Sequence, residues 1–331
     1  MYYRKIKLLV SLFAIVTLLS GCGKPQEQKQ VPASIGTSYT VVDSQGTKVT
    51  IPKKPLKILS QSLTFDTMIL GIVPPERMAA ACFLDQEPDS SYIIEETKNI
   101  KPVIHSFTSI PTELVIQIKP DVIILPSTNK PEMINAFRDL GYPVVVCKTP
   151  RNIEDIKNDI KLIAQTVQEE DAGRRVIAEM DRQMADIKAT LDKRTGKKPV
   201  AMLVSKMTNY GGKGSMFDEL CNNARVINGI AAVGINNGEK LTKELVVAAD
   251  PDFFLVSKPK VNDVAKAEEF KQEFLNDPAL EGMRALKHII PIPNKYLYSN
   301  SQNCVWAIKG IANYAYGDVF DMSQEKLIKG Y

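Results

Sequence analysis

Two glutamates in this chain of 331 residues stand in nearly the same sequence context. Glu113 opens the segment ELVIQIKPDVIIL and Glu244 opens ELVVAADPDFFLV, and in both a Pro-Asp pair follows seven residues after the glutamate. Thr112 and Thr242 lie just before them, which is typical of a helix start, where the helix dipole stabilises a carboxylate. The sequence therefore predicts that a helix start carrying a glutamate occurs twice in the chain.

Residues arranged for catalysis or for metal binding are sparse. No G-x-G-x-x-G follows the first predicted strand, YGGKGS lacks the spacing of a P-loop, and G-x-S-x-G does not occur. The only histidines are His105 and His288, and no cluster of His, Asp and Glu suits a bare zinc or manganese ion. We expect neither an enzyme nor a resident cofactor; an α/β enzyme and an exported adhesion protein are distant alternatives.

The composition is that of a globular protein long enough for two domains. Hydrophobic residues make up 44% of the chain and charged residues 24%, which excludes a disordered or fully membrane-embedded protein. The chain holds 42 Lys and Arg against 38 acids, but Arg4, Lys5 and Lys7 lie in the first 21 residues, which contain no acid. The remaining 39 basic residues balance the acids, so no nucleic acid partner is indicated.

The first 21 residues have the pattern of a signal peptide. A short basic start precedes LLVSLFAIVTLL, an apolar run of 12 that would span only about 18 Å as a helix, against a bilayer core of roughly 30 Å. The segment LLSGC resembles a bacterial lipobox, which implies a lipid on Cys22; a simple secretory signal is the alternative. Residues 22–38 predict a flexible tether. We expect an extracytoplasmic protein that is lipid-anchored to the bacterial cell membrane.

Four further cysteines are far apart and form no C-x-x-C pair. They are Cys82, Cys147, Cys221 and Cys304. Export leaves disulfides possible, but a chain of this size needs none, and we expect mostly buried thiols.

Apolar strands alternate with helices along most of the chain. Residues 39–52 predict two short strands, and LKILSQS, MAAACF, DVIILP and PVVVCK predict four more, with helices near 63–72, 112–118 and 131–140. This alternation is typical of a parallel sheet covered on both faces.

A helix of about 37 Å is predicted from about 170 to 194, and the alternation restarts after it. Its apolar stripe consists of Ile177, Met180, Met184, Ile187 and Leu191. The later strands are VAMLVS, DFFLVS and HIIPIP, with helices at SMFDELCNNA, KELVVAA, 263–276 and 301–316. The predicted fold is α/β, with two Rossmann-like lobes of mainly parallel sheets joined by one long α-helix. The predicted boundaries are 1–21 for the signal peptide, 22–38 for the tether, 39–168 for the N-terminal lobe, 169–195 for the linking helix and 196–331 for the C-terminal lobe.

The order of these parts resembles the iron-chelate and cobalamin class of ABC-transporter substrate-binding proteins, which have a class III periplasmic-binding-protein fold. The resemblance rests on VVDSQGTKVTIPKKPLKILS, the two E-L-V…P-D segments, GGKGSMFDEL and IANYAYGDVF, and covers the chain from about residue 39 onward. It implies a monomer that captures a chelate between its lobes and delivers it to a permease homodimer with its ATPase. It further implies that Glu113 and Glu244 dock on the permease and that the single linking helix limits closure of the lobes.

Ligands of parallel-sheet lobes bind at the carboxyl ends of the strands. The candidate ligand-binding residues are Gln61, Ser62, Phe83, His105 and Phe107 in the first lobe, and Lys206, Tyr210, Lys258 and Tyr298 in the second. Tyr298 falls near a position where relatives place an aromatic residue against the ligand. The segment CNNARVING departs from the family, which often has a glycine pair before Asn228, and this weakens the transfer of residue roles in the second lobe.

Three classes of ligand fit these candidate ligand-binding residues. Aromatic residues with Lys206, Lys213 and Lys258 suit an anionic iron–siderophore complex, which is the main prediction. His105 could be the axial ligand of a haem iron, although a lone loop histidine more often forms hydrogen bonds. The same apolar surface would suit a corrinoid such as cobalamin. His288 is expected to be structural, just before a buried strand.

Overall fold

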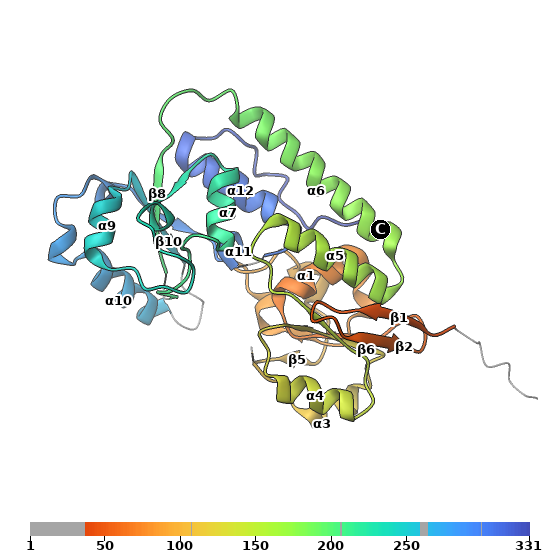
Figure 1. Ribbon diagram of the computed structural model, residues 1–331. Coiled ribbons are helices and arrows are strands. Elements are labelled where there is room, and N and C mark those ends of the chain that lie inside the picture. Colours follow the sequence, from red (N-terminus) through yellow and green to blue (C-terminus); the bar gives the residue numbers. More distant parts are fainter. Residues whose placement is uncertain (1–36, 107, 206, 259–263, 299) are drawn as a thin grey trace, which may run out of the picture. The chain divides into compact units, whose positions relative to one another are not determined.

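The computed structural model describes residues 37–106, 108–205, 207–258, 264–298 and 300–331 (Figure 1). The predicted signal peptide, Cys22 and most of the predicted tether lie outside these residues. Residues 36–331 form one compact unit. Within the described part, no helix has both the length and the apolar character needed to cross a bilayer.

The first lobe contains a parallel sheet in the order β3-β6-β7. Its strands are β3 (Ile58–Ser60), β6 (Val122–Pro126) and β7 (Val144–Cys147), preceded by the antiparallel hairpin of β1 (Tyr39–Val42) and β2 (Lys48–Ile51). Its helices are α1 (Leu63–Ile72), α2 (Ile94–Thr97), α3 (Thr112–Ile118), α4 (Pro131–Asp139) and α5 (Ile153–Val167). The predicted strand MAAACF forms only over β4 (Ala81–Cys82), which pairs with β5 (Val103–Ile104) in a separate two-stranded sheet.

Alternating side chains of β6 fill two different cores. Val122 and Ile124 pack with residues of α1 and α5, whereas Ile123 and Leu125 pack with residues of α3 and α4. Successive side chains of a strand point to opposite faces, so an uninterrupted apolar strand requires helices on both sides. The predicted parallel sheet with both faces covered is therefore confirmed in this lobe.

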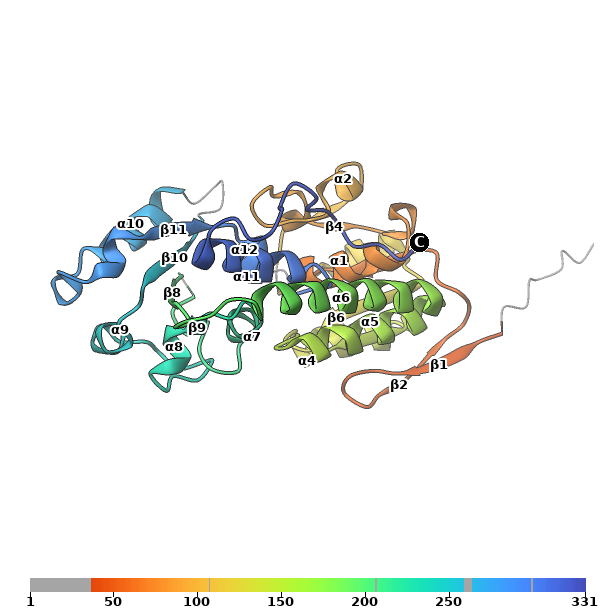
Figure 2. The same ribbon diagram turned by 90° about the horizontal axis from the view of Figure 1, so that it is seen from above.

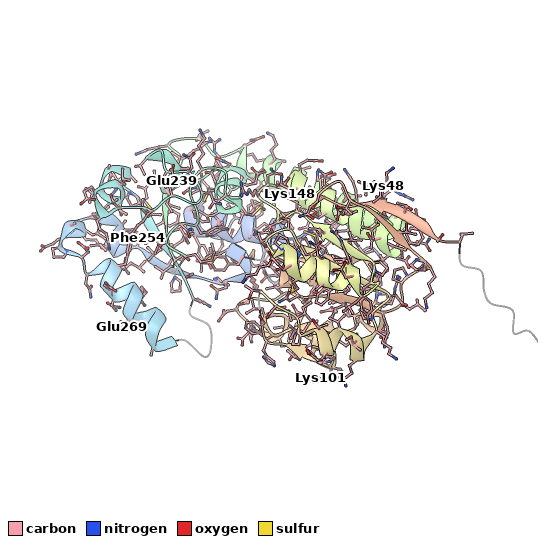
Figure 3. All side chains as sticks on the ribbon, turned by 60° about the horizontal axis from the view of Figure 1, so that its bottom comes forward. Lys48, Lys101, Lys148, Glu239, Phe254 and Glu269 are labelled. Carbon is pink, nitrogen blue, oxygen red and sulfur yellow. The ribbon has the colours of Figure 1, made fainter. Side chains whose placement is uncertain are left out.

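The second lobe repeats this arrangement with a four-stranded parallel sheet in the order β11-β10-β8-β9. Its strands are β8 (Val200–Val204), β9 (Ile227–Asn228), β10 (Phe253–Ser257) and β11 (Ile289–Ile292). Its helices are α7 (Met216–Asn223), α8 (Gly229–Ala232), α9 (Lys243–Ala249), α10 (Val264–Leu275), α11 (Lys295–Tyr298) and α12 (Cys304–Tyr316). Figure 3 shows Phe254 of β10 inside this lobe and Glu269 on the outside of α10.

The edge strand β11 corrects one expectation. His288 is exposed, and so are Ile289 and Pro291 of the strand that follows it, because β11 has a neighbour on one side only. The strand after His288 is therefore half-exposed rather than buried.

The long helix α6 (Glu170–Leu191) joins the two lobes, as predicted. Its Val176 and Met180 are buried in a hydrophobic core that includes residues of both lobes, and α5 and α6 lie side by side (Figures 1 and 2). Toward its other end, Gln183 accepts a hydrogen bond of 2.8 Å from Lys309 of α12. The predicted stripe is thus buried at Met180, Ile187 and Leu191, and only half-buried at its other two positions.

The end of the chain returns from the second lobe to the first. Leu327 and Ile328 are buried, and the Gly330 N–H donates to the Gly71 carbonyl of α1 at 2.8 Å. Gln302, just before α12, donates to the Thr67 carbonyl of the same helix at 2.7 Å. Figures 1 and 2 both show the C-terminus beside α1 and α6. The lobes are therefore tied by a second crossing of the chain, which the sequence did not suggest.

Two buried carboxyl groups lie together in the first lobe, and one of them belongs to the short segment that also carries Phe83. Asp66 is on α1, and Asp85 is in the short 3-10 helix Phe83–Gln86, where it accepts a hydrogen bond of 2.7 Å from the Cys82 N–H. Burial raises the pKa of Asp66 to about 7. Burial, and then the charge of Asp66, raise the pKa of Asp85 well above its usual value. The pair therefore holds protons near neutral pH.

Replacing Asp66 with Asn should make the protein more stable at pH 8 than the natural chain. A carboxyl group whose pKa rises on folding stabilises the protein at low pH, and this contribution is lost as the pH rises from about 4 through 7. Each pKa unit is worth about 1.36 kcal/mol, so Asp66→Asn should gain on the order of 2–4 kcal/mol at pH 8 and little at pH 4. Urea unfolding at both pH values measures this; Asp159, whose pKa burial also raises to about 7, is present in both proteins and cancels in the comparison. An equal difference at the two pH values would contradict the assignment.

Candidate functional site

The two E-L-V segments form matching helices. Both α3 and α9 have seven residues with the glutamate in the first turn. Both end on a residue in the left-handed region, Lys119 with φ 52° and Asp250 with φ 42°. A proline follows each of these residues and disfavours a further helical turn. The repetition in the sequence is therefore a repetition in backbone structure.

The aspartate of each Pro-Asp pair ties its helix to the neighbouring strand. Asp121 accepts hydrogen bonds of 2.9 Å from the N–H groups of Leu56 and Lys57, just before β3. Asp252 accepts one of 2.7 Å from the N–H of Val200, the first residue of β8. In each sheet this carboxylate joins the strand it precedes to the adjacent parallel strand.

Glu113 and Glu244 both have exposed side chains. A hydrogen bond from its own backbone N–H, followed by one from the Thr242 side chain, lowers the pKa of Glu244. This carboxylate is therefore ionised at neutral pH and available to a cationic partner.

Gln61 is buried directly after β3, and its amide group is fully engaged. Its Nε2 donates to the carbonyls of Ser106 and Ser109, both at 2.9 Å, and its Oε1 accepts from Asn129 at 3.3 Å. It holds the loop that follows His105 against the end of the sheet. Gln61 therefore positions this loop and has no free polar atom for a ligand, while its neighbour Ser62 is only half-buried.

Phe83 and His105 come together at the same end of the first lobe. The rings stack with their centroids 6.1 Å apart and their planes inclined by 23°. Phe83 is half-buried and His105 is exposed. The pair offers an apolar ring face beside an imidazole that solvent, or a ligand, can reach.

Tyr210 and Tyr298 come together in the second lobe. Their ring centroids are 5.5 Å apart, the Tyr210 hydroxyl donates to the Leu297 carbonyl at 2.8 Å, and the Tyr298 hydroxyl lies 2.5 Å from Ser205 Oγ. Burial raises the pKa of both phenols. Both are neutral hydrogen-bonding groups that brace the end of β8, and Tyr298 lies on the short helix α11 rather than in a loop.

Lys258, at the end of β10, reaches across to the first lobe. Its Nζ lies 3.2 Å from Asp89 Oδ1, and the Asp89 carbonyl accepts a hydrogen bond of 2.8 Å from the Lys295 N–H. Asp89 is a contact that the sequence gave no reason to select, because it lies in an irregular loop. The missed residues Asn129 and Ser205 could have been found, because Ser205 ends the predicted strand VAMLVS and Asn129 closely follows the predicted strand DVIILP.

Two predicted ligand residues, Phe107 and Lys206, lie outside the described residues. The four other cysteines are free and buried, and burial raises the pKa of their thiols, as expected for unreactive groups. The described residues contain no group of three His, Cys, Asp or Glu side chains that could hold a metal ion.

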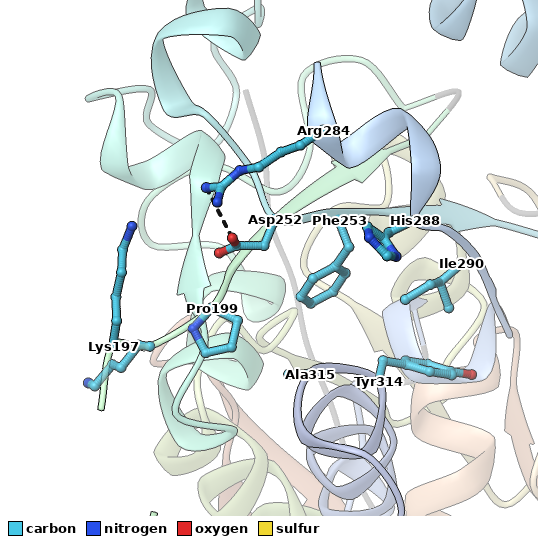
Figure 4. Close-up of a pocket in the computed structure, with 10 residues that line it drawn as sticks. Lys197, Pro199, Asp252, Phe253, Arg284, His288, Ile290, Tyr314 and Ala315 are labelled. Carbon is cyan, nitrogen blue, oxygen red and sulfur yellow. Dashed lines mark ion pairs between the residues drawn. The ribbon is translucent and has the colours of Figure 1, made fainter. Parts of the chain in front are cut away.

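Two cavities lie in the second lobe, at opposite ends of its sheet. One of about 230 Å³ contacts Ser205, Met207 and Tyr210 at the carboxyl end of β8. The other, of about 490 Å³, lies at the amino ends of the strands and is lined by Pro199, Asp252, Phe253, His288 and others (Figure 4). There Arg284 is already paired with Asp252 at 3.0 Å. Only the smaller cavity lies where parallel sheets bind ligands.

Comparison with known proteins decides the class of this fold. The model of the periplasmic binding protein family matches residues 85–295. The chain belongs to this family. The membership confirms the predicted class, a solute-binding protein.

Similar proteins agree with this assignment. An uncharacterized ABC transporter substrate-binding lipoprotein, YvrC of Bacillus subtilis (strain 168), is 25% identical over 254 residues, which cover 73% of this chain and 77% of YvrC. A probable siderophore-binding lipoprotein of the same organism, YfiY, is 26% identical over 59% of this chain and 58% of its own length. The apo form of the periplasmic heme-binding protein RhuT from Roseiflexus sp. RS-1 has a TM-score of 0.67 at 20% identity, covering 80% of this chain and 99% of RhuT. The structural similarity to RhuT confirms the fold.

Replacing Gln61 with Leu should loosen the loop that carries His105. The substitution removes the donors to two carbonyl groups, and unsatisfied polar groups of this kind cost about 1–3 kcal/mol. We expect a lower unfolding free energy and faster amide hydrogen exchange in residues 104–112. Ser62→Ala, at the adjacent half-buried position, serves as the control and should leave this exchange unchanged. Equal protection of the loop in both variants would show that Gln61 does not hold it.

Proposed function

We propose that the protein is the extracytoplasmic substrate-binding lipoprotein of an ABC importer and that it captures an iron–siderophore complex between its two lobes. The observation that carries this proposal is the doubled helix with an exposed glutamate, one copy on each lobe of a periplasmic-binding-protein fold. The lipid anchor on Cys22 and the location outside the cytoplasm rest on the sequence pattern and on the lipoprotein relatives.

The proposed ligand site lies at the carboxyl ends of the strands of both lobes. In the first lobe Phe83 and His105 present an open aromatic face. In the second lobe the cavity at Ser205 and Tyr210 lies at the equivalent end of β8. Lys258 faces Asp89 of the first lobe, and an anionic chelate would compete with this aspartate for the lysine. An aromatic surface with a lysine suits an anionic ferric siderophore, and the siderophore-binding relative supports this ligand class.

Haem is the second candidate, and His105 is the observation that favours it. Its imidazole is exposed, so one of its nitrogens could coordinate a haem iron, and the stacked Phe83 ring would hold the imidazole in place rather than stack on the porphyrin. The structural likeness to a heme-binding protein is compatible with this alternative. A corrinoid would use the same apolar surface without needing His105.

Titration with three chelates distinguishes these ligands. We expect a ferric siderophore to bind, as measured by isothermal titration calorimetry and by quenching of Trp306 emission. Since Trp306 is buried on α12, quenching would arise by energy transfer to the chelate rather than by contact. His105→Ala should weaken this binding without abolishing it, because Phe83 and Lys258 remain. A Soret shift with haem that His105→Ala abolishes, together with no response to ferric siderophores, would instead establish haem as the ligand; binding of cobalamin alone would identify a corrinoid carrier.

Glu113 and Glu244 are proposed to dock on the permease. A homodimeric permease presents the same surface twice, related by two-fold symmetry, and a monomeric partner must offer two equivalent contacts. An exposed ion pair is worth only about 0.2–1 kcal/mol, but close interfacial pairs reach coupling energies of about 1.5–7 kcal/mol. Two such pairs are sufficient to fix the orientation of the protein on its importer.

The double charge reversal Glu113→Lys and Glu244→Lys should abolish transport and leave ligand affinity unchanged. Both side chains are exposed and neither of them lines the cavity at Ser205 or contacts Phe83 or His105, so we expect the ligand site to stay intact. Uptake of radiolabelled iron chelate in cells, with calorimetry on the purified variant, measures the two effects separately. Glu132→Lys, at an exposed glutamate in the first turn of α4, is the matched control. Loss of ligand binding in the double variant would assign the two glutamates a structural role.

A further inference from the structure

Each duplicated helix exposes an apolar side chain one turn after its glutamate. Ile116 of α3 is 49% exposed and Val247 of α9 is 43% exposed, and each lies three residues after Glu113 or Glu244. Residues three apart on a helix are neighbours on its surface. The valine two positions after each glutamate, Val115 or Val246, is buried on the opposite side. Each lobe therefore presents a carboxylate beside a β-branched apolar group, which we call the Glu–aliphatic pair.

Folding gives no reason for an exposed Ile or Val at these positions. Both residues have lower helix propensity than alanine, because their branched side chains lose rotamer freedom against the preceding turn. Eight large hydrophobic residues are exposed in the described part of the chain, and only Ile116 and Val247 of these lie within a helix. That both occur at the same position of the repeat indicates a shared role at the surface.

The rest of the exposed surface of the two helices is not matched. Gln117 corresponds to Ala248, and the residue that ends the helix is Lys119 in one lobe and Asp250 in the other. The exposed side chains that both helices have in common are thus the glutamate and the aliphatic residue, and the repeated Leu114 and Leu245 are only half-buried beside them. A partner that treats both lobes alike contacts features that both helices share.

Both helices are held at their carboxyl ends by a basic side chain from a neighbouring segment. Lys57 Nζ donates to the Ile118 carbonyl at 2.9 Å, and Arg284 Nη2 donates to the Asp250 carbonyl at 3.2 Å. Cations at this end of a helix stabilise it through the dipole. The Glu–aliphatic pairs are therefore fixed before binding, which reduces the ordering cost of association.

We propose that the two Glu–aliphatic pairs form one docking surface for a two-fold symmetric membrane permease, each pair fitting a site where a basic side chain borders an apolar pocket. This inference rests on the proposed function. It adds a hydrophobic contact to the ionic contact between the two glutamates and the permease. The aliphatic group excludes water from the ion pair, and desolvation strengthens the electrostatic attraction between the two charges. The partner is the permease homodimer because its symmetry accounts for the duplication and because the exposed charges require a basic surface.

The double variant Ile116→Ala, Val247→Ala tests the aliphatic contact. The probe is the importer of the same bacterium, permease dimer with ATPase in nanodiscs, and its binding to the full-length lipoprotein is followed by surface plasmon resonance at several salt concentrations. We expect binding to weaken about ten- to a hundredfold, mainly through faster dissociation, because two partly buried aliphatic groups are truncated. The salt dependence should persist, and each single variant should give a similar share of the loss. The thermal midpoint should not fall, because alanine favours the helix.

Two matched variants separate this inference from the proposed function. Leu140→Ala, at another exposed apolar residue of the first lobe, should bind like the natural protein. Glu113→Gln, Glu244→Gln should weaken binding and flatten its salt dependence. If the glutamine variant weakens binding while Ile116→Ala, Val247→Ala behaves like Leu140→Ala, the aliphatic contact is wrong and ionic docking stands. If neither double variant weakens binding, the docking role of both helices is wrong.

Discussion

Both lobes depend on a carboxylate that accepts backbone N–H groups from the neighbouring strand. Asp121 bonds to the chain just before β3, and Asp252 bonds to the first residue of β8. The proline before each aspartate disfavours continuation of the helix. Together they fix the point where a helix stops, a buried strand begins and a second strand pairs with it. The helix that carries the glutamate is thereby oriented by the sheet itself, so the outer surface and the core are set by the same few residues.

The connection between the lobes is more extensive than one helix. The α6 helix packs on α5 and also contacts α12, and the returning C-terminal segment bonds to α1 through Gly330. Asp89 adds a side-chain and a main-chain contact with the second lobe. Several contacts spread across the boundary oppose a wide hinge motion, since each would have to break. They are consistent with the small closure that the resemblance implies, and the Asp89–Lys258 ion pair is the contact that an anionic ligand could replace.

Much of the fold could be predicted from the sequence, because buried parallel strands leave a strong pattern. The bounds of α3 follow from Thr112 at its start and Lys119-Pro120 at its end, and the long helix follows from the spacing of its apolar residues. The short strand β4 was predicted too long, because MAAACF is apolar whether it pairs with a strand or only packs. The return of the C-terminal segment had no periodic signal; it depends on contacts such as Ile328 with residues distant in sequence.

The candidate ligand-binding residues are harder to assign, because a position at the end of a strand does not indicate whether the side chain supports the fold or is accessible to a ligand. Gln61 and Tyr210 stand where predicted, yet their polar atoms are engaged by main-chain carbonyls. The exposed His105 ring stacks on Phe83, which lies 22 residues earlier in the sequence. The pairing of β4 with β5 brings these two residues together. The positions could be read from the sequence, but the division between supporting and accessible side chains required the tertiary contacts.

The two lobes are alike where they expose α3 and α9 and different at the ends of their sheets. The outer helices agree in length, in the left-handed conformation of the residue that ends them, in the glutamate and in the exposed aliphatic residue, whereas the strand ends carry Phe83 with His105 in one lobe and the bonded tyrosine pair in the other. A ligand without internal symmetry gains nothing from two equal walls, but a two-fold symmetric permease requires two equal contacts. The proposed function accounts for both observations. It assigns the repeated helices to the two-fold symmetric permease and the unequal strand ends to the ligand, which has no internal symmetry.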